Sequence, residues 1–232
     1  MMSKALTVLS VTAHPDDEVL GFGATAAKLV SEGSHVYNCI LSGQVEARRN
    51  KPEQEELQAD IKNAESILNC TGTILGSFPN IEFNTVPHIE LVRFIENAIQ
   101  DIQPDYIFTH HPYDLNNDHY HVSKACQAAA RLYQRKSDIT PIKGLYLMEI
   151  PSSTDWSFPI DSNHFQPNTF FEVGMENIQK KISALDAYRG VMRPYPHSRS
   201  KESLEALATF RGAQAGVRYA EAFQMIFQIT PF

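Results

Sequence analysis

Two clusters of metal-ligating side chains stand out in the sequence. In the first, His14-Pro-Asp-Asp-Glu18, His14 and Asp17 are three residues apart around a proline-led turn. At this spacing an imidazole nitrogen and a carboxylate oxygen can converge on one metal ion. The consecutive carboxylates of Asp16, Asp17 and Glu18 repel one another and need a cation, a helix N-terminus or hydrogen bonds to compensate. The cluster is typical either of a metal site or of a helix whose first turn is acidic.

The second cluster is rich in histidine. Residues 110–121 contain four of the nine histidines of the chain. One of these, together with His14 and Asp17, would complete a His, Asp, His set with an open position for water, as expected of a catalytic rather than a structural zinc site. Histidine ligands usually donate their other ring N–H to a carboxylate, and Asp114 and Asp118 are close enough in sequence to accept it.

Both clusters follow predicted β-strands, at the carboxyl ends where open α/β sheets bind ligands. The run at residues 5–12 is short, apolar and β-branched, which predicts a buried strand. Further strands are predicted at 35–41, 73–78, 106–109 and 144–150, and helices at 19–31, 53–68, 88–100, 119–133, 175–188 and 201–210. The alternation of strands and helices predicts an α/β fold, with a parallel sheet covered by helices on both faces.

The domain organisation follows from the length of 232 residues, which suits a single domain. We expect an α/β core over residues 1–150 and a cap with the C-terminal helices over residues 151–232 of the same domain. Residues 152–168 are rich in Ser, Pro, Asp and Asn and predict a long surface loop, which could act as a lid.

The composition excludes several classes of protein. Hydrophobic residues make up 43% and charged residues 20% of the chain, as in ordinary globular proteins. We expect no membrane span, because no apolar run approaches about 18 residues, and a cytoplasmic location, because no signal peptide is evident. The net charge of −7 argues against nucleic acid as a partner. Cys39, Cys70 and Cys126 predict neither a disulfide framework nor a thiolate zinc site.

Three segments together resemble the LmbE-like, or PIG-L-type, metal-dependent N-deacetylases. They are Ala13–Glu18 (AHPDDE), the pair Asp118-His119 and the segment Tyr219–Phe223 (YAEAF), and the similarity runs from residue 5 to about residue 227. The resemblance implies a Rossmann-like α/β fold and a zinc ion held by His14, Asp17 and His119. It also implies that Asp16 is the general base and that the substrate is a small N-acetylated sugar or a conjugate of one. Zinc lowers the pKa of a bound water to roughly 7, and Asp16 can accept the proton of that water without being a ligand.

One position departs from the family pattern. Many relatives carry a histidine three residues before the second histidine ligand, whereas this chain has Asn116. An amide donates hydrogen bonds but cannot shuttle a proton at neutral pH. Asn116 is therefore expected to stabilise the oxyanion, and His111, His197 or the returning proton of Asp16 would supply the acid. Asp118 is expected to orient an imidazole or tune the base.

The substrate-binding residues are less constrained by the sequence. We place Arg48, His111 and Arg199 in this role, because the two arginines lie in loops and a guanidinium suits phosphate or carboxylate groups. If several arginines converge, the sugar would be phosphorylated or nucleotide-linked. Glu221 is expected to be a structural acid paired with a nearby arginine. The sequence leaves the oligomeric state open, including a homo-oligomer.

Two alternatives remain at this point. Ferrous iron accepts the same ligands as zinc, so a non-haem iron enzyme is one of them, although the α/β alternation disfavours the β-rich scaffold expected there. A non-enzymatic nucleotide- or sugar-binding module is the other. Gly21 and Gly23 give only part of a dinucleotide-binding fingerprint, which needs a third glycine.

Overall fold

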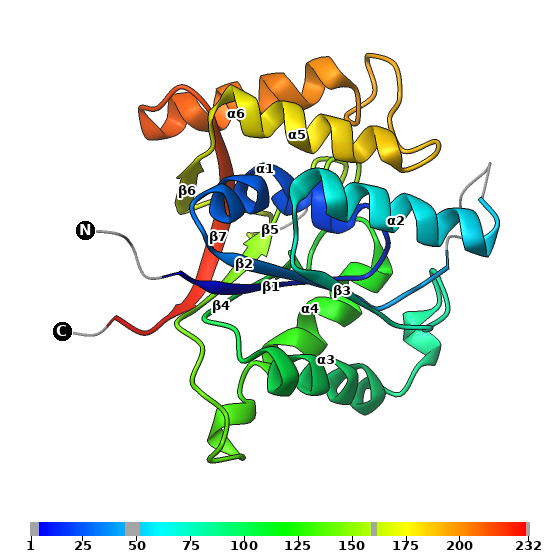
Figure 1. The fold of residues 1–232 in the computed structure, drawn as a ribbon, viewed down its shortest axis with the longest axis vertical. Coiled ribbons are helices and arrows are strands. Elements are labelled where there is room, and N and C mark those ends of the chain that lie inside the picture. Colours follow the sequence, from blue (N-terminus) through cyan, green and yellow to red (C-terminus); the bar gives the residue numbers. More distant parts are fainter. Residues whose placement is uncertain (1–4, 45–51, 159–161, 231–232) are drawn as a thin grey trace.

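The computed structural model describes residues 5–44, 52–158 and 162–230. In these residues a single seven-stranded sheet has the order β3-β2-β1-β4-β5-β7-β6 (Figure 1). The strands are β1 (Thr7–Thr12), β2 (His35–Ile40), β3 (Gly72–Leu75), β4 (Tyr106–His110), β5 (Gly144–Met148), β6 (Thr169–Glu172) and β7 (Ala220–Gln228). The α-helices are α1 (Asp17–Ser31), α2 (Gln54–Leu68), α3 (His88–Ile102), α4 (Asn117–Ala129), α5 (Gly174–Ala187) and α6 (Lys201–Ala215), and the short 3₁₀ helices are η1 (Phe83–Thr85) and η2 (Leu132–Gln134).

The first five strands form the parallel part of the sheet. β1 pairs in parallel with β2 on one side and β4 on the other, so successive connections leave β1 in opposite directions. This reversal opens a crevice at the carboxyl ends of β1 and β4, where doubly wound sheets bind their ligands. The predicted Rossmann-like α/β fold with helices on both faces is confirmed.

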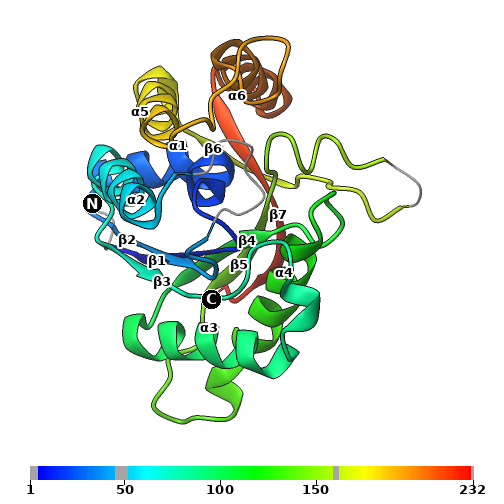
Figure 2. The same cartoon turned by 90° about the vertical axis from the view of Figure 1, so that its right-hand side faces the viewer.

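The helices form layers on the two faces of the sheet (Figures 1 and 2). α1 and α2 cover one face and α3 and α4 cover the other, and each side has its own hydrophobic cluster. α5 lies outside α1 and α2 and packs on both, so it forms a second layer on that face. Helix α1, which follows the cluster at residues 14–18, is therefore packed between the sheet and α5.

The C-terminal half contributes more to the sheet than the sequence predicts. β7 lies between β5 and β6 and is antiparallel to both. Neither β6 nor β7 is predicted by the sequence, whereas the helices predicted at 175–188 and 201–210 correspond to α5 and α6. The segment after residue 150 thus adds two strands to one edge of the sheet as well as an outer layer of helices.

The glycines of the partial fingerprint serve packing. A Cβ at Gly21 would lie 2.6 Å from Ile150 Cδ1 and 3.0 Å from Met148 Cβ. Only a residue without a side chain lets α1 approach the end of β5 this closely. Gly21 is thus explained by the contact between α1 and the sheet.

Candidate metal centre

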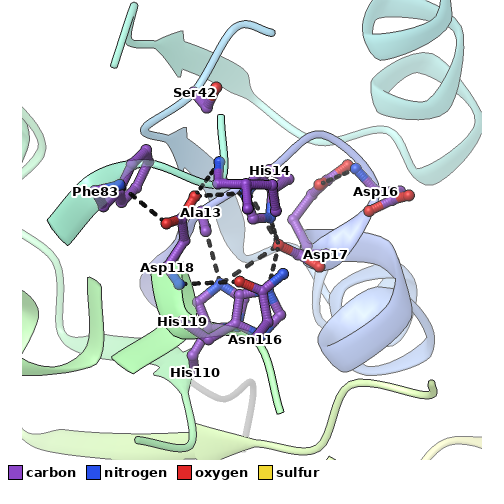
Figure 3. Close-up of polar contacts among 12 residues, drawn as sticks. Ala13, His14, Asp16, Asp17, Ser42, Phe83, His110, Asn116, Asp118 and His119 are labelled. Carbon is purple, nitrogen blue, oxygen red and sulfur yellow. Dashed lines mark hydrogen bonds and ion pairs between the residues drawn. The ribbon is translucent and has the colours of Figure 1, made fainter. Parts of the chain in front are cut away.

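The two predicted clusters meet at the carboxyl ends of β1 and β4 (Figure 3). His14 to Asp17 form the turn from β1 into α1, and Asn116 to His119 begin α4. They border a cavity of about 210 Å³. The residues that line it are His14, Asp16, Asp17, Asn80, Ile81, Asn116, His119, Ile150, Ser152, Ser153 and Arg199.

A sharp turn places the first cluster. Asp16 has a φ of 103°, a conformation that residues other than glycine rarely adopt. The Asp16 N–H donates to Glu18 Oε2 at 3.0 Å, and the His14 N–H donates to Asp17 Oδ2 at 3.0 Å. These bonds fold the turn so that His14 and Asp17 face the same point.

Three side chains offer ligand atoms that lie close together. One such atom from each of His14, Asp17 and His119 lies within 4.8 Å of the other two, and all three residues are buried. Asp17 Oδ2 is central: His14 Nδ1 lies 3.3 Å from it and His119 Nε2 lies 3.2 Å from it. Two imidazoles and one carboxylate are the ligand types of a catalytic zinc site.

Each imidazole is also held by a second carboxylate. His14 Nε2 lies 3.0 Å from Asp118 Oδ2, and His119 Nδ1 lies 2.6 Å from Asp114 Oδ2. The opposite nitrogen of each ring faces Asp17, and His119 Nε2 is buried without a hydrogen-bond partner among the described residues. A metal ion would satisfy this nitrogen, and carboxylates behind the ligands are typical of metal-bound histidines. The residues present therefore fit a divalent metal.

A second group of possible ligands, His110, Asp114 and His119, fits less well. His110 Nε2 accepts a hydrogen bond from the Ala13 N–H at 2.8 Å, so its lone pair is used. Two members of the group, His119 and Asp114, are already hydrogen-bonded to each other through His119 Nδ1. His110 instead stacks on His119, with ring centroids 3.7 Å apart, and so supports that ring.

Charges around the site shift several pKa values. Burial opposes the charged form of His119, but the carboxylates of Asp114 and Asp17 outweigh it and raise the pKa to about 10. Burial also opposes ionisation of Asp17, yet His119 holds its pKa well below the usual value. Burial raises the pKa of Glu18 to about 8, and the negative charge of Asp16 adds to this effect. The metal-free site is thus a network of coupled charges.

Asp16 and Asn116 face the cavity without belonging to the ligand set. Arg199 Nη1 lies 3.5 Å from Asp16 Oδ2, and Arg199 Nε donates to Ser152 Oγ at 2.6 Å. Asn116 is the N-cap of α4, and its Oδ1 accepts from the Asp118 N–H at 2.9 Å. The cap fixes the orientation of the Asn116 amide, so its NH₂ group is the part left to donate elsewhere.

Other predicted residues lie elsewhere. His111 lines a separate groove of about 570 Å³, where burial lowers its pKa to about 4. His197 Nδ1 accepts from the Arg199 N–H, and its ring packs against Trp156 outside the cavity lining. Arg48 lies outside the described residues. The structure therefore brings Arg199, but neither His111 nor His197, to the cavity.

Several residues that line the cavity were not predicted from the sequence. Asn80 and Ile81 come after β3, and Ile150, Ser152 and Ser153 come after β5. The one available signal was that both segments follow predicted strands at the same edge of the sheet. Glu221 was expected to pair with an arginine, but it pairs with Lys181, whose Nζ lies 2.6 Å from Glu221 Oε1.

Among the described residues, no helix is both long enough and apolar enough to cross a lipid bilayer.

Comparisons with known proteins match this architecture. Residues 9–130, just over half of the chain, match the PIG-L family, described as GlcNAc-PI de-N-acetylase. The uncharacterized deacetylase YaiS of Escherichia coli K12 is 25% identical over 195 residues, which cover 81% of this chain and 92% of that protein.

Two solved structures show the same fold. The conserved protein TT1542 of Thermus thermophilus has a TM-score of 0.78 at 22% identity, covering 98% of this chain and 97% of that one. The N,N'-diacetylchitobiose deacetylase of Pyrococcus horikoshii has a TM-score of 0.78 at 20% identity, covering 100% of this chain and 89% of that one.

Proposed function

Because the chain belongs to the PIG-L family of de-N-acetylases, we propose that it is a zinc-dependent hydrolase that removes the acetyl group from a small N-acetylated sugar. One observation carries the proposal. Two buried imidazoles, each bonded to its own carboxylate, turn their other nitrogens toward Asp17, and the separate carboxylate of Asp16 lies beside them. Family membership favours an N-deacetylase over the non-haem iron enzyme and the binding module.

His14, Asp17 and His119 would hold the metal, with Asp118 and Asp114 orienting the two histidines. When bound, such an ion polarises the acetamide carbonyl and makes a water more acidic. We favour zinc over ferrous iron because removal of an acetyl group by water needs a Lewis acid and no change of oxidation state, and zinc hydrolases use ligand sets of two histidines and one carboxylate.

Asp16 is the proposed general base. It lines the cavity and is next to a ligand in sequence, but it is not itself one of the three candidate ligands. The Asp16 carboxylate would accept a proton from the attacking water and pass it to the nitrogen of the leaving amine. Arg199, held by Ser152, lies at its side, with Nη1 3.5 Å from Asp16 Oδ2.

Asn116 would stabilise the oxyanion. Its Oδ1 is occupied by the Asp118 N–H, so the NH₂ group can donate to the oxygen on which charge develops. His111 and His197 do not line the cavity, so the proposal gives them no part in proton transfer. Return of the proton from Asp16 is then the route that remains of the three considered.

The lining of the cavity favours a neutral sugar. Asn80, Ser152 and Ser153 supply amide and hydroxyl groups that suit sugar hydroxyls. Arg199 is the one arginine in the lining formed by the described residues, and its charge faces Asp16. A phosphorylated or nucleotide-linked substrate would need a further cation.

We also propose that residues 1–232 form a single deacetylase domain. β7 lies beside β5 of the parallel core, and β6 pairs with β7, so the C-terminal segment completes the same sheet. Separation of this segment from the core would expose the edge of β5.

The test combines metal analysis with product detection. The wild-type protein is expected to contain one metal ion per chain, and His119→Ala to lose it. His121→Ala, two residues further along α4, is the matched control and is expected to keep the ion. Acetate release from N-acetylglucosamine, its oligomers and nucleotide-linked forms should require the metal. Asp16→Asn should keep the metal, but its kcat should fall about 10²- to 10⁴-fold. No metal after reconstitution, or no acetate from any sugar, would contradict the proposal.

A further inference from the structure

We propose that helix α5 holds the backbone of Asp16 in place through two side chains, Lys181 within the helix and Tyr188 at its C-cap. Neither of these residues lines the cavity, so they act as positioning residues. The inference rests on the proposed role of Asp16 as general base. It accounts for Glu18 and Glu221, two acidic residues of the family-like segments that the proposed chemistry does not use.

The backbone of Asp16 needs support because its conformation is unfavourable. A left-handed φ of 103° at a residue other than glycine is strained and persists where the surroundings enforce it. Both polar groups of this backbone are held. The N–H donates to Glu18 Oε2, and the C=O accepts from the N–H groups of Val19 and Leu20, at 3.1 and 2.8 Å.

The first support runs from Tyr188 through Glu18. The Tyr188 hydroxyl donates to Glu18 Oε1 at 2.5 Å, and the other oxygen of the same carboxylate accepts the Asp16 N–H. Tyr188 is 1% exposed and Glu18 is 4% exposed. The Tyr188 hydroxyl therefore fixes the rotation of a buried carboxylate whose far side positions the Asp16 peptide.

The second support runs from Lys181 through Leu20. Lys181 Nζ donates to the Leu20 carbonyl at 2.7 Å, and the Leu20 N–H donates to the Asp16 carbonyl. One residue of α1 thus links the ammonium group to the peptide of the proposed base. A Cβ at Gly23 would lie 3.1 Å from Lys181 Cγ, so the glycine leaves room for the lysine stem.

Glu221 completes the second support from β7. It accepts from Lys181 Nζ at 2.6 Å, and it also accepts from the N–H groups of Ala24 and Thr25, at 3.2 and 2.7 Å. In a regular helix those N–H groups would donate hydrogen bonds to the carbonyls four residues earlier, those of Leu20 and Gly21. The Lys181–Glu221 pair therefore takes part in the hydrogen bonding of the α1 backbone: Lys181 donates to a carbonyl of α1, and Glu221 accepts from two of its N–H groups.

The geometry of α5 makes the two supports act together. Tyr188 and Lys181 are seven residues apart, two helical turns, so they project from the same face of α5 toward α1. A buried ion pair is weak evidence for stability, because a well-packed apolar pair is often as stable. This favours a role for the pair in orientation, which an apolar replacement would lose.

The first test removes one hydroxyl. Tyr188→Phe is compared with Tyr146→Phe, a matched loss of a hydroxyl from a buried tyrosine of β5 that has no hydrogen bond to α1 among the described residues. We expect kcat to fall about tenfold in Tyr188→Phe, with KM within about twofold and the metal content unchanged. Amide hydrogen exchange at Asp16 and Leu20 should become faster in Tyr188→Phe and stay at the wild-type rate in Tyr146→Phe.

The second test replaces the ion pair by an apolar pair that can fold. Lys181→Met combined with Glu221→Leu should keep a cooperative thermal transition, lose about tenfold in kcat and show faster exchange at Leu20. Lys180→Met, which replaces the more exposed neighbouring lysine, is the control and should change neither kcat nor the exchange rate at Leu20. Wild-type kcat and wild-type exchange in both folded variants would overturn the inference. If the wild type releases no acetate, the proposed function fails, whereas the exchange rates still decide whether α5 holds the Asp16 backbone.

Discussion

The carboxylate behind His119 should set both the strength and the pH dependence of metal binding. Asp114 Oδ2 lies 2.6 Å from His119 Nδ1, and Asp114 Oδ1 accepts from the Asn116 N–H at 2.9 Å. Asp114→Asn keeps the shape of the side chain but exchanges one acceptor oxygen for an NH₂ group, so one of these two bonds must be lost. The negative charge beside the imidazole is lost as well.

The magnitude follows from the pKa of His119. At a pKa of about 10, the His119 ring of the metal-free protein is a cation at pH 7, with a proton on each ring nitrogen. Metal binding must remove the proton, which costs about 4 kcal/mol at pH 7, three pH units at 1.36 kcal/mol each. The association constant of the wild type should therefore rise at least about tenfold per pH unit from pH 6 to pH 9 and level off near pH 10. The rise should be steeper at the acid end, because His14 must also lose a proton: burial opposes its charged form, but the hydrogen bonds to Asp118 and Asp17 raise its pKa.

The variant should respond differently at the two ends of this range. Without Asp114 as a carboxylate, the pKa of His119 is raised less, so proton competition weakens and the rise with pH ends earlier. Loss of the supporting carboxylate should weaken metal binding about 10- to 100-fold, or about 1.4–2.7 kcal/mol. The difference in metal affinity between Asp114→Asn and the wild type should be largest at pH 9. It should be smaller at pH 7, because there the wild type must lose the proton of His119 before it can bind the metal.

The assay is competition with a chromophoric chelator for zinc between pH 6 and pH 9.5. Asp186→Asn, an exposed aspartate on α5, is the matched control and should follow the wild-type curve. A wild-type affinity that does not change between pH 7 and pH 9, or an Asp114→Asn affinity equal to the wild type at pH 9, would refute the reasoning.

Three further predictions concern folding and chemistry. Because burial raises the pKa of Glu18 to about 8 from 4.5, the metal-free folded protein should lose stability as the pH rises through this range, and Glu18→Gln should reduce that loss by a few kcal/mol in urea unfolding at pH 5 and pH 9. Asn116→Asp keeps an N-cap oxygen but removes the amide donor, so kcat should fall about 10²- to 10³-fold with little change in Tm, and a wild-type kcat would exclude the oxyanion role. Gly21→Ala should destabilise the protein by about 1–3 kcal/mol in thermal unfolding, since its Cβ would meet Ile150 and Met148, and an unchanged Tm would contradict the close packing.

The first half of the fold could be predicted because its signals are local. The strand at residues 7–12, the helix that starts at Asp17 and the strand at residues 106–110 each have their own pattern of apolar residues, and they alternate along the chain. Parallel strands place their carboxyl ends at one edge of the sheet. Two polar clusters that follow such ends are therefore expected to lie close together. This is why His14 could be placed beside a histidine of residues 110–121 from the pattern alone, whereas the choice of His119 came from the family resemblance.

The C-terminal strands could not be predicted because their pairing is long-range. β7 is buried at each of its first four residues and so lacks the alternation of a half-exposed strand, while β6 has only four residues. They pair with each other across about fifty residues of chain, and their position is fixed by β5. The lysine partner of Glu221 escaped prediction for the same reason, because Lys181 lies forty residues earlier on α5.

The histidines show where closeness in sequence misleads. His110 is the last residue of β4, and its ring stacks on His119 at the metal centre, whereas the neighbouring His111 lines the separate groove. Successive side chains of an extended chain point to opposite faces, so two adjacent histidines at a strand end cannot both face one site. The same geometry limits the acid of the proposed reaction. Because His111 and His197 do not line the cavity, the proposal assigns proton transfer in both directions to Asp16. Under this proposal the position of the Asp16 backbone should matter more than in a site with a separate histidine acid, and we propose α5 as the element that holds it.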